Sequence, residues 1–248
     1  MKSNRSIWLL TVFVLLLPSA IFADENFSQK LYREYVRNSL DNWEPILREM
    51  ERNIGKGENP ELLYELTLGQ YGFIGYLASE GREKKAKTVL GDAFKNAEKL
   101  LKIREDWAEA YAVTGGLFGL KIILSPITAP VSGPKSMKNI EKAISVDPYS
   151  PAGYIEKGNA RYSMPRAFGG SEEEAVELLE KGILLMENQG KNEENWYYLN
   201  ALLALAQIFS ETGRSGKYEA VLRKMVQQEP EMKWVLSKDS GELFRKME

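Results

Sequence analysis

Hydrophobic residues recur at helical spacing along almost the whole chain. Near its beginning, Phe27, Leu31 and Tyr35 fall four residues apart, and a second apolar stripe starts at Trp43. Residues four apart share one face of an α-helix, and no stretch alternates apolar and polar residues cleanly enough to predict a strand. The pattern therefore predicts an all-α protein, whose first two helices end near the turn at residues 55–57.

Two more helical pairs are predicted on either side of the middle of the chain. One covers residues 60–77 and 84–103, and the other covers residues 195–211 and 217–228. Each pair is joined by a short polar or glycine-containing segment, which favours an antiparallel hairpin.

The middle of the chain carries a repeated motif. Pro148 precedes a helix with Tyr154 and, one turn later, Gly158; Tyr111 and Gly115 stand in the same relation one unit earlier. The motif resembles the tetratricopeptide repeat (TPR), a helical hairpin of about 34 residues with an aromatic in helix A and small residues where the helices cross. The resemblance implies a TPR-like α-solenoid of antiparallel hairpins, which follows an N-terminal helix pair.

The units are longer than the usual TPR period. Tyr111, Tyr154 and Tyr197 follow one another at intervals of 43 residues. Between helix A and helix B the excess falls in residues 125–136 and 163–171, both rich in proline and glycine. Because these residues oppose a continuous helix, both stretches are predicted to be loops on one edge of the array.

The second stretch contains Phe168-Gly169-Gly170. A comparable turn is found in proteins similar to the T-component of TRAP transporters, so this weaker resemblance implies a periplasmic helper that handles a small organic ligand. The residues themselves predict a structural role. Ser171 caps helix B and Glu174 completes a capping box. Phe168 packs beside the cap as a hydrophobic staple or folds under the turn.

The first 23 residues have the features of a secretory signal. Lys2 and Arg5 precede an apolar run of 11 residues, and Ala23 stands before the acidic Asp24. The run is about half as long as a membrane-spanning helix needs to be, so removal after Ala23 is favoured over a retained membrane anchor.

Export would leave a periplasmic or secreted protein. Three regions are expected: a signal peptide at residues 1–23, a helical pair at 24–57 and a TPR-like array at 58–248.

Composition excludes several kinds of chemistry. The chain has no cysteine and no histidine, so it lacks a thiolate nucleophile, an imidazole base and a Cys/His zinc site. With 33 basic and 35 acidic residues, its formal charge is -2, and no basic run indicates a nucleic-acid partner. The acids are scattered at surface spacing, as in Glu172 to Glu174, where they suit a helix start. No catalysis, metal or cofactor is expected.

Helix A of each TPR unit lines the concave face of the solenoid. In the best-defined unit this places Ile155, Asn159 and Tyr162 in the groove, with Arg161 at its rim. Arg166 and the proline-rich stretch around Pro130 would lie beside it. The predicted site therefore comprises Ile155, Asn159, Arg161, Tyr162, Arg166 and Pro130.

The function predicted from these features is an exported, non-catalytic scaffold that binds a protein or peptide partner. The alternatives are a helper for a small organic ligand and a carboxylate-based hydrolase. An open groove would favour protein binding, a closed apolar tunnel would favour the ligand helper, and two convergent buried carboxylates would favour the hydrolase.

Overall fold

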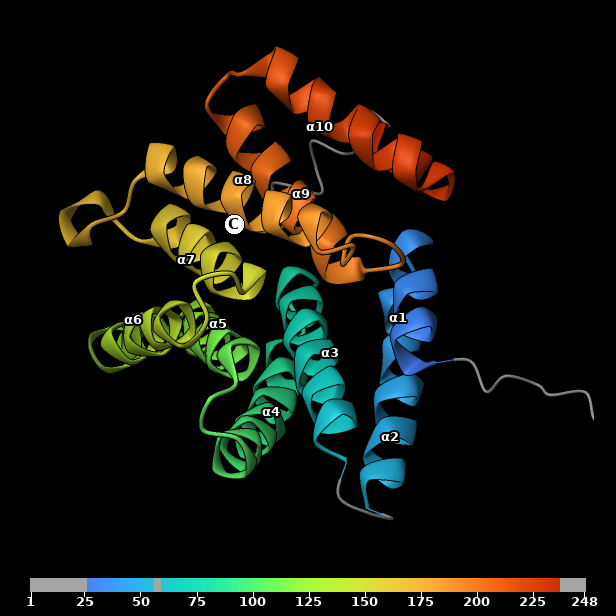
Figure 1. The fold of residues 1–248 in the computed structure, drawn as a ribbon, viewed down its shortest axis with the longest axis vertical. Coiled ribbons are helices and arrows are strands. Elements are labelled where there is room, and N and C mark those ends of the chain that lie inside the picture. The colour runs from blue at the N-terminus through green and yellow to red at the C-terminus, as the bar shows by residue number, and fades with distance from the viewer. Residues whose placement is uncertain (1–25, 56–58, 237–248) are drawn as a thin grey trace, which may run out of the picture.

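The computed structural model describes residues 26–55 and 59–236, and this part of the chain forms ten α-helices, four short 3-10 helices and no strand (Figure 1). The α-helices are α1 (Phe27–Val36), α2 (Trp43–Ile54), α3 (Pro60–Ser79), α4 (Glu83–Ile103), α5 (Ala108–Leu124), α6 (Ala129–Val146), α7 (Pro151–Ser163), α8 (Glu172–Asn188), α9 (Trp196–Glu211) and α10 (Ser215–Gln228). The 3-10 helices are η1 (Leu40–Asn42), η2 (Pro126–Thr128), η3 (Arg166–Phe168) and η4 (Pro230–Leu236). The all-α prediction is confirmed.

Consecutive helices pair as hairpins, α3 with α4, α5 with α6, α7 with α8 and α9 with α10 (Figure 1). The first helix of a pair lies deeper than the second: twelve of the 16 residues of α9 are buried, against three of the 14 residues of α10. The first helices thus form the inner layer and the second helices the outer layer of a TPR-like solenoid.

Glycines allow the close crossings that the repeat pattern predicts. A Cβ atom on Gly158 of α7 would lie 2.8 Å from the side chain of Leu179 and 3.1 Å from the Ala175 carbonyl oxygen of α8. On Gly115 of α5, a Cβ would lie 2.6 Å from Ile140 of α6. Only glycine leaves room for the facing helix at these points, so the register assigned to these two hairpins is confirmed.

Filling these crossings should destabilise the fold. We expect Gly158→Leu and Ala143→Leu each to lower the free energy of unfolding by about 1 to 3 kcal/mol, because the added volume must push packed helices apart. Urea midpoints measure this. Gly91→Leu is the control, since a Cβ at Gly91 meets no atom within 4 Å. Unchanged midpoints for both core variants would contradict the assigned crossings.

The loop predicted at residues 125–136 is wrong, because α6 runs through Pro134. Pro130 stands in the first turn of α6, where a backbone N–H needs no helical partner, so the first turn accommodates it. The Ser136 hydroxyl donates to the Gly115 carbonyl oxygen at 2.8 Å and holds α6 on α5. The excess residues of this unit lengthen its helices to 17 and 18 residues, apart from the short turn between them.

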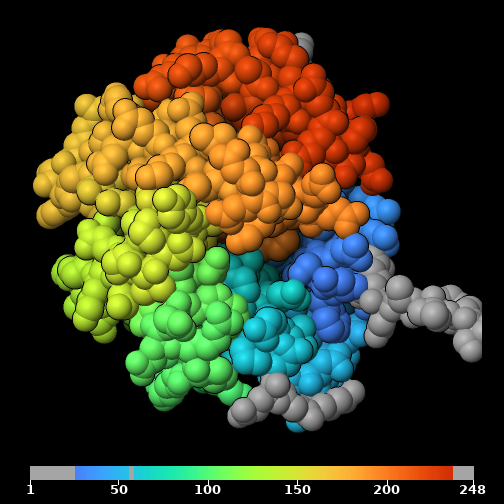
Figure 2. All heavy atoms as spheres, viewed as in Figure 1, coloured from blue at the N-terminus to red at the C-terminus, as the bar shows by residue number. Residues whose placement is uncertain are grey.

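The N-terminal pair shares the core of the array. One cluster of buried hydrophobic side chains extends from Leu31 of α1 to Val235 of η4. Figure 2 shows the blue N-terminal helices lying directly against the orange segment near the start of α9. Within residues 26–55 and 59–236, no helix is both long enough and apolar enough to cross a bilayer.

Candidate functional site

The inner helices bring one carboxyl group to the middle of the array. Glu156 of α7 is 2% exposed. Its Oε1 accepts a hydrogen bond from the Tyr197 hydroxyl of α9 at 2.7 Å, and its Oε2 accepts one from the Tyr71 hydroxyl of α3 at 3.0 Å. A Cβ on Gly116 of α5 would lie 2.6 Å from Oε2. Four inner helices therefore meet at this carboxyl group.

Burial changes the protonation of this cluster. It raises the pKa of Glu156 from 4.5 to about 7, and the hydrogen bonds from neighbouring side chains oppose only part of that rise. Burial also raises the pKa of Tyr71 and of Tyr197 well above their ordinary value, so both remain hydroxyl donors. Among the described residues, Glu156 is the one buried acid. The pair of buried carboxylates that a hydrolase would need is therefore not found in this part of the chain.

The N-terminal pair covers part of the concave face. Trp43 of α2 is fully buried, and its ring centroid lies 4.9 Å from that of Trp196 on α9, in an edge-to-face arrangement. Tyr35 of α1 contacts Trp196 at 6.0 Å between ring centroids. A Cβ on Gly72 of α3 would lie within 2.8 Å of both indole rings. Between α3 and α9, the open groove predicted from the sequence is filled by α1 and α2.

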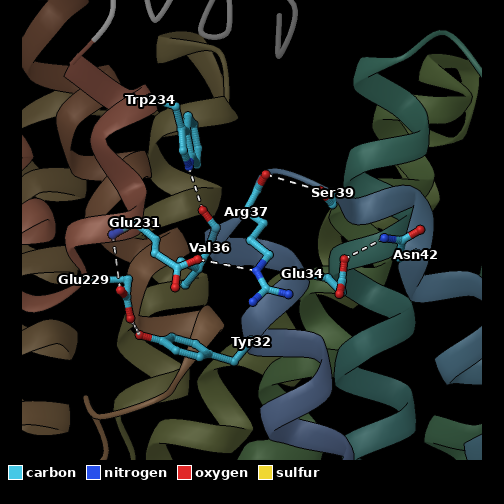
Figure 3. Close-up of polar contacts among 9 residues, drawn as sticks. All are labelled: Tyr32, Glu34, Val36, Arg37, Ser39, Asn42, Glu229, Glu231 and Trp234. Carbon is cyan, nitrogen blue, oxygen red and sulfur yellow. Dashed lines mark hydrogen bonds and ion pairs between the residues drawn. The ribbon is translucent and has the colours of Figure 1, made fainter.

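The two ends of the described chain are tied together (Figure 3). The Tyr32 hydroxyl donates to Glu229 at 2.9 Å, and the Trp234 indole donates to the Val36 carbonyl oxygen at 2.8 Å. An ion pair of 3.4 Å also joins Arg37, at the end of α1, to Glu231 of η4. These contacts, which we call the clasp, close the array between its first helix and its last segment.

Two hollows in the surface are small, and most of the residues that line each of them are polar or charged. One, of about 150 Å³, lies beside the clasp and is lined by two arginines and three glutamates among other residues. The other, of about 290 Å³, lies between the start of α1 and the start of α3. Pockets for organic ligands hold about 300 to 1,000 Å³ and are mostly apolar. Neither hollow is the apolar tunnel that a ligand helper would need.

Two of the predicted site residues face the protein interior. The placement of Ile155 in an open groove is wrong: its side chain is 0% exposed, and a Cβ on Gly182 of α8 would lie 2.6 Å from it. Asn159 is half-buried and hydrogen-bonds both Glu156 and Tyr71. Its amide therefore belongs to the buried carboxyl cluster.

Tyr162 and Arg161 hold neighbouring elements together. The Tyr162 hydroxyl donates to the carboxylate of Glu211 at the end of α9. Arg161 Nε lies 3.0 Å from Glu174 Oε1 of α8, and its Nη1 donates to the Gly169 carbonyl oxygen at 2.8 Å. Both side chains are already engaged within the fold, which makes them braces in this structure.

The backbone conformation of residues 164–171, which we call the α7–α8 loop, is fixed by two glycines and a helix cap. Gly169 has a φ of +97°, which favours glycine, and a Cβ on Gly170 would lie 1.7 Å from the Met164 carbonyl oxygen. The predicted cap is confirmed, since the Ser171 hydroxyl accepts from the Glu174 backbone N–H at 3.1 Å. The Glu174 side chain does not complete a capping box, because it pairs with an arginine on α7.

The α7–α8 loop displays two large side chains. Phe168 is 77% exposed, so the prediction that it packs beside the cap is wrong. The Arg166 side chain is also 77% exposed, and its nearest acid is Glu172, at 3.6 Å. Pro130, the remaining predicted residue, is exposed at the start of α6. Arg166 and Pro130 are thus the predicted site residues that the structure leaves most open.

Sequence reasoning missed the carboxyl cluster and the clasp. A signal existed for the first: Glu156 and Asn159 are three residues apart, so two polar side chains share a face of an inner helix. For the clasp there was none, because Tyr32 and Glu229 are 197 residues apart.

Comparison by sequence finds no matching family and no matching curated protein. Comparison of structures finds the HusA haemophore from Porphyromonas gingivalis, with a TM-score of 0.59 and 16% identity over 76% of this chain and 95% of that chain. It also finds TTC0263, a thermophilic TPR protein in Thermus thermophilus, with a TM-score of 0.54 and 18% identity over 88% of this chain and 96% of that chain. At such identities the likeness shows the fold alone, a TPR-like array of helices.

Proposed function

We propose that this chain is an exported, non-catalytic TPR-like scaffold that binds a protein partner through the α7–α8 loop. One observation carries the proposal: a braced loop displays an aromatic and a guanidinium side chain, Phe168 and Arg166, each 77% exposed. Aromatic and arginine side chains dominate many protein interfaces. TPR-like folds are in general protein-interaction modules, which supports the class of partner.

The chemistry of the loop defines what it would bind. The planar guanidinium of Arg166 suits a carboxylate, and Phe168 suits an apolar side chain next to it. The braces around Gly169 fix the loop before binding, which lowers the entropy that complex formation costs. The expected partner is a protein segment with an acidic and an apolar residue side by side.

Export remains a proposal that rests on the sequence, since residues 1–23 lie outside the described residues. The mature chain would begin at Asp24. The ligand-helper alternative gains no support from the two hollows, although one structural neighbour is described as a haemophore.

Truncating the displayed side chains should weaken binding without unfolding the protein. We expect Arg166→Ala and Phe168→Ala each to cost about 1 to 2 kcal/mol or more of binding free energy. The partner is first captured from the exported fraction of the producing cells and identified by mass spectrometry, and its affinity for each variant is then measured by titration. Thermal midpoints should stay near that of the wild type, because neither side chain is buried.

Two control variants distinguish a loss of partner binding from a loss of fold stability. Leu184→Ala removes a side chain that is 55% exposed on α8, away from the loop, and should bind normally. Tyr162→Ala removes the contact with Glu211 and should lower the thermal midpoint. Normal binding by both loop variants would refute the proposed surface.

A further inference from the structure

The corner where α5 joins α6 displays a set of aliphatic side chains. Ile127 is 89% exposed, Val131 is 63% exposed and Ile123 is 57% exposed. Pro126 and Pro130 are exposed beside them. We call these five residues the aliphatic tip. Proteins in water rarely expose several large apolar side chains close together in the sequence, and such groups commonly mark an interaction site. The aliphatic tip is therefore a candidate interaction site.

Lysines stand behind the tip on both helices. Between Glu109 and Glu141 the sequence contains Lys121, Lys135 and Lys138 and no acidic residue. In the part of the chain that the structure describes, none of these lysines forms an ion pair. Lys121 lies over the Phe94 ring at 6.0 Å and Lys135 over the Phe118 ring at 5.8 Å, so these two contacts are with neutral rings. The residues of this hairpin end therefore carry positive charge only, although the whole chain has a formal charge of -2.

The lysines and the tip are arranged in tiers along the helix axes. On α6, Lys135 and Lys138 follow Val131 by four and seven residues, which is about 6 Å and about 10 Å of helical rise. On α5, Lys121 precedes Ile123 by two residues, which is about 3 Å of helical rise and places it on the other face of that helix. On α6, the apolar side chain thus comes first and the cations stand one to two turns behind it.

We propose that the aliphatic tip docks onto an anionic membrane surface, with the lysines at the level of the lipid phosphates. A bilayer offers an apolar layer beneath a negatively charged one, and interfacial segments insert by about 5 to 10 Å, which matches the spacing of the tiers. The positive charge of the lysines decides the choice of partner, because it complements anionic headgroups. This membrane contact is separate from the α7–α8 loop and would place the proposed protein-binding loop near a membrane.

The test uses a dye that senses its surroundings. Because the chain has no cysteine, Ile127→Cys in the full chain provides a single site for a nitrobenzoxadiazole label. With vesicles of phosphatidylcholine and phosphatidylglycerol, the dye should brighten and shift to shorter wavelength; with phosphatidylcholine alone it should not. The matched control is the same label on Leu184→Cys, a 55% exposed position on α8, which should not respond. A local label reports the tip itself, whatever residues 1–23 do.

Charge is tested with a triple variant. Added to labelled Ile127→Cys, K121Q/K135Q/K138Q should weaken vesicle binding on the order of a hundredfold, at about fivefold for each lysine near an anionic surface. The control K87Q/K95Q/K102Q removes the same charge from α4, where the lysine side chains are 50%, 78% and 73% exposed, and should bind like the parent.

Three results would overturn the proposal. If the dye at residue 127 neither brightens nor shifts to shorter wavelength with anionic vesicles, membrane docking is excluded and an acidic protein surface is favoured as the partner. Brightening that depends on protein concentration without vesicles would assign the tip to self-association. Equal losses in the two triple variants would show that total charge, and not the tip, directs binding.

Discussion

Glu156→Gln should abolish a loss of stability that the wild-type protein suffers as the pH rises from about 4.5 to about 7. The pKa of Glu156 is about 7 in the fold, against an ordinary value of 4.5. In that window the unfolded chain has already released the proton while the folded chain still binds it. Stability therefore falls with rising pH by about 3 kcal/mol in total, and no further above the folded pKa.

The glutamine variant mimics the protonated acid at every pH. Its free energy of unfolding, measured by urea titration and compared with that of the wild type, should gain about 3 kcal/mol between about pH 4 and about pH 8. Taking the difference between the two proteins cancels the titration of all other carboxylates. A difference that does not change with pH would refute the proposed state of Glu156.

Glu187→Gln provides a control of opposite sign. Burial opposes the shift, but the Lys224 ammonium and the Tyr198 hydroxyl together lower the pKa of Glu187. A lowered pKa contributes stability above the ordinary value of 4.5, and the contribution is lost as the pH falls through the folded value. Glu187→Gln should therefore be less stable than the wild type at neutral pH and approach it in acid.

Gly72→Leu should disrupt the contact between the N-terminal pair and the array. A Cβ at this position would lie 2.7 Å from the Trp196 ring and 2.8 Å from the Trp43 ring, and both indoles are enclosed by other side chains. Neither ring has space to retreat. We expect a loss of about 3 kcal/mol in the free energy of unfolding, at the upper end of what added core volume costs.

The same helix offers the control. A Cβ at Gly75 meets no atom within 4 Å, so Gly75→Leu adds the same volume to α3 without a clash. It should be neutral or slightly stabilising, because leucine favours a helix more than glycine does. Tryptophan fluorescence during urea unfolding reports both variants. Equal stability of the two would mean that α1 and α2 do not depend on the Trp43–Trp196 contact.

The candidate site was partly predictable. The turn at Gly169 and the Ser171 cap follow from local backbone chemistry, so sequence reasoning located the α7–α8 loop. It could not decide which side chains the loop leaves open. The sequence predicts a covered Phe168 and an open Ile155, but the structure exposes Phe168 and buries Ile155. Exposure depends on which helices pack beside a residue, and this is not a local property.

Local sequence determined the helices and their pairing. Apolar spacing of three and four residues, glycines at the crossings and short connections are enough to form hairpins, because each acts within one or two neighbouring helices. One local rule gave a wrong result: the proline content of residues 125–136 predicted a loop, but Pro130 falls in a first turn, which tolerates proline, and α6 continues through Pro134 in its interior.

The tertiary structure alone decided how the array is closed and what its centre contains. Trp43 meets Trp196 across 153 residues of sequence, and the clasp joins segments even further apart. Glu156 lies between tyrosines of two other inner helices because the solenoid curves tightly enough to bring them together. Such contacts depend on the summed rotation of successive hairpins, which no single segment of the chain specifies.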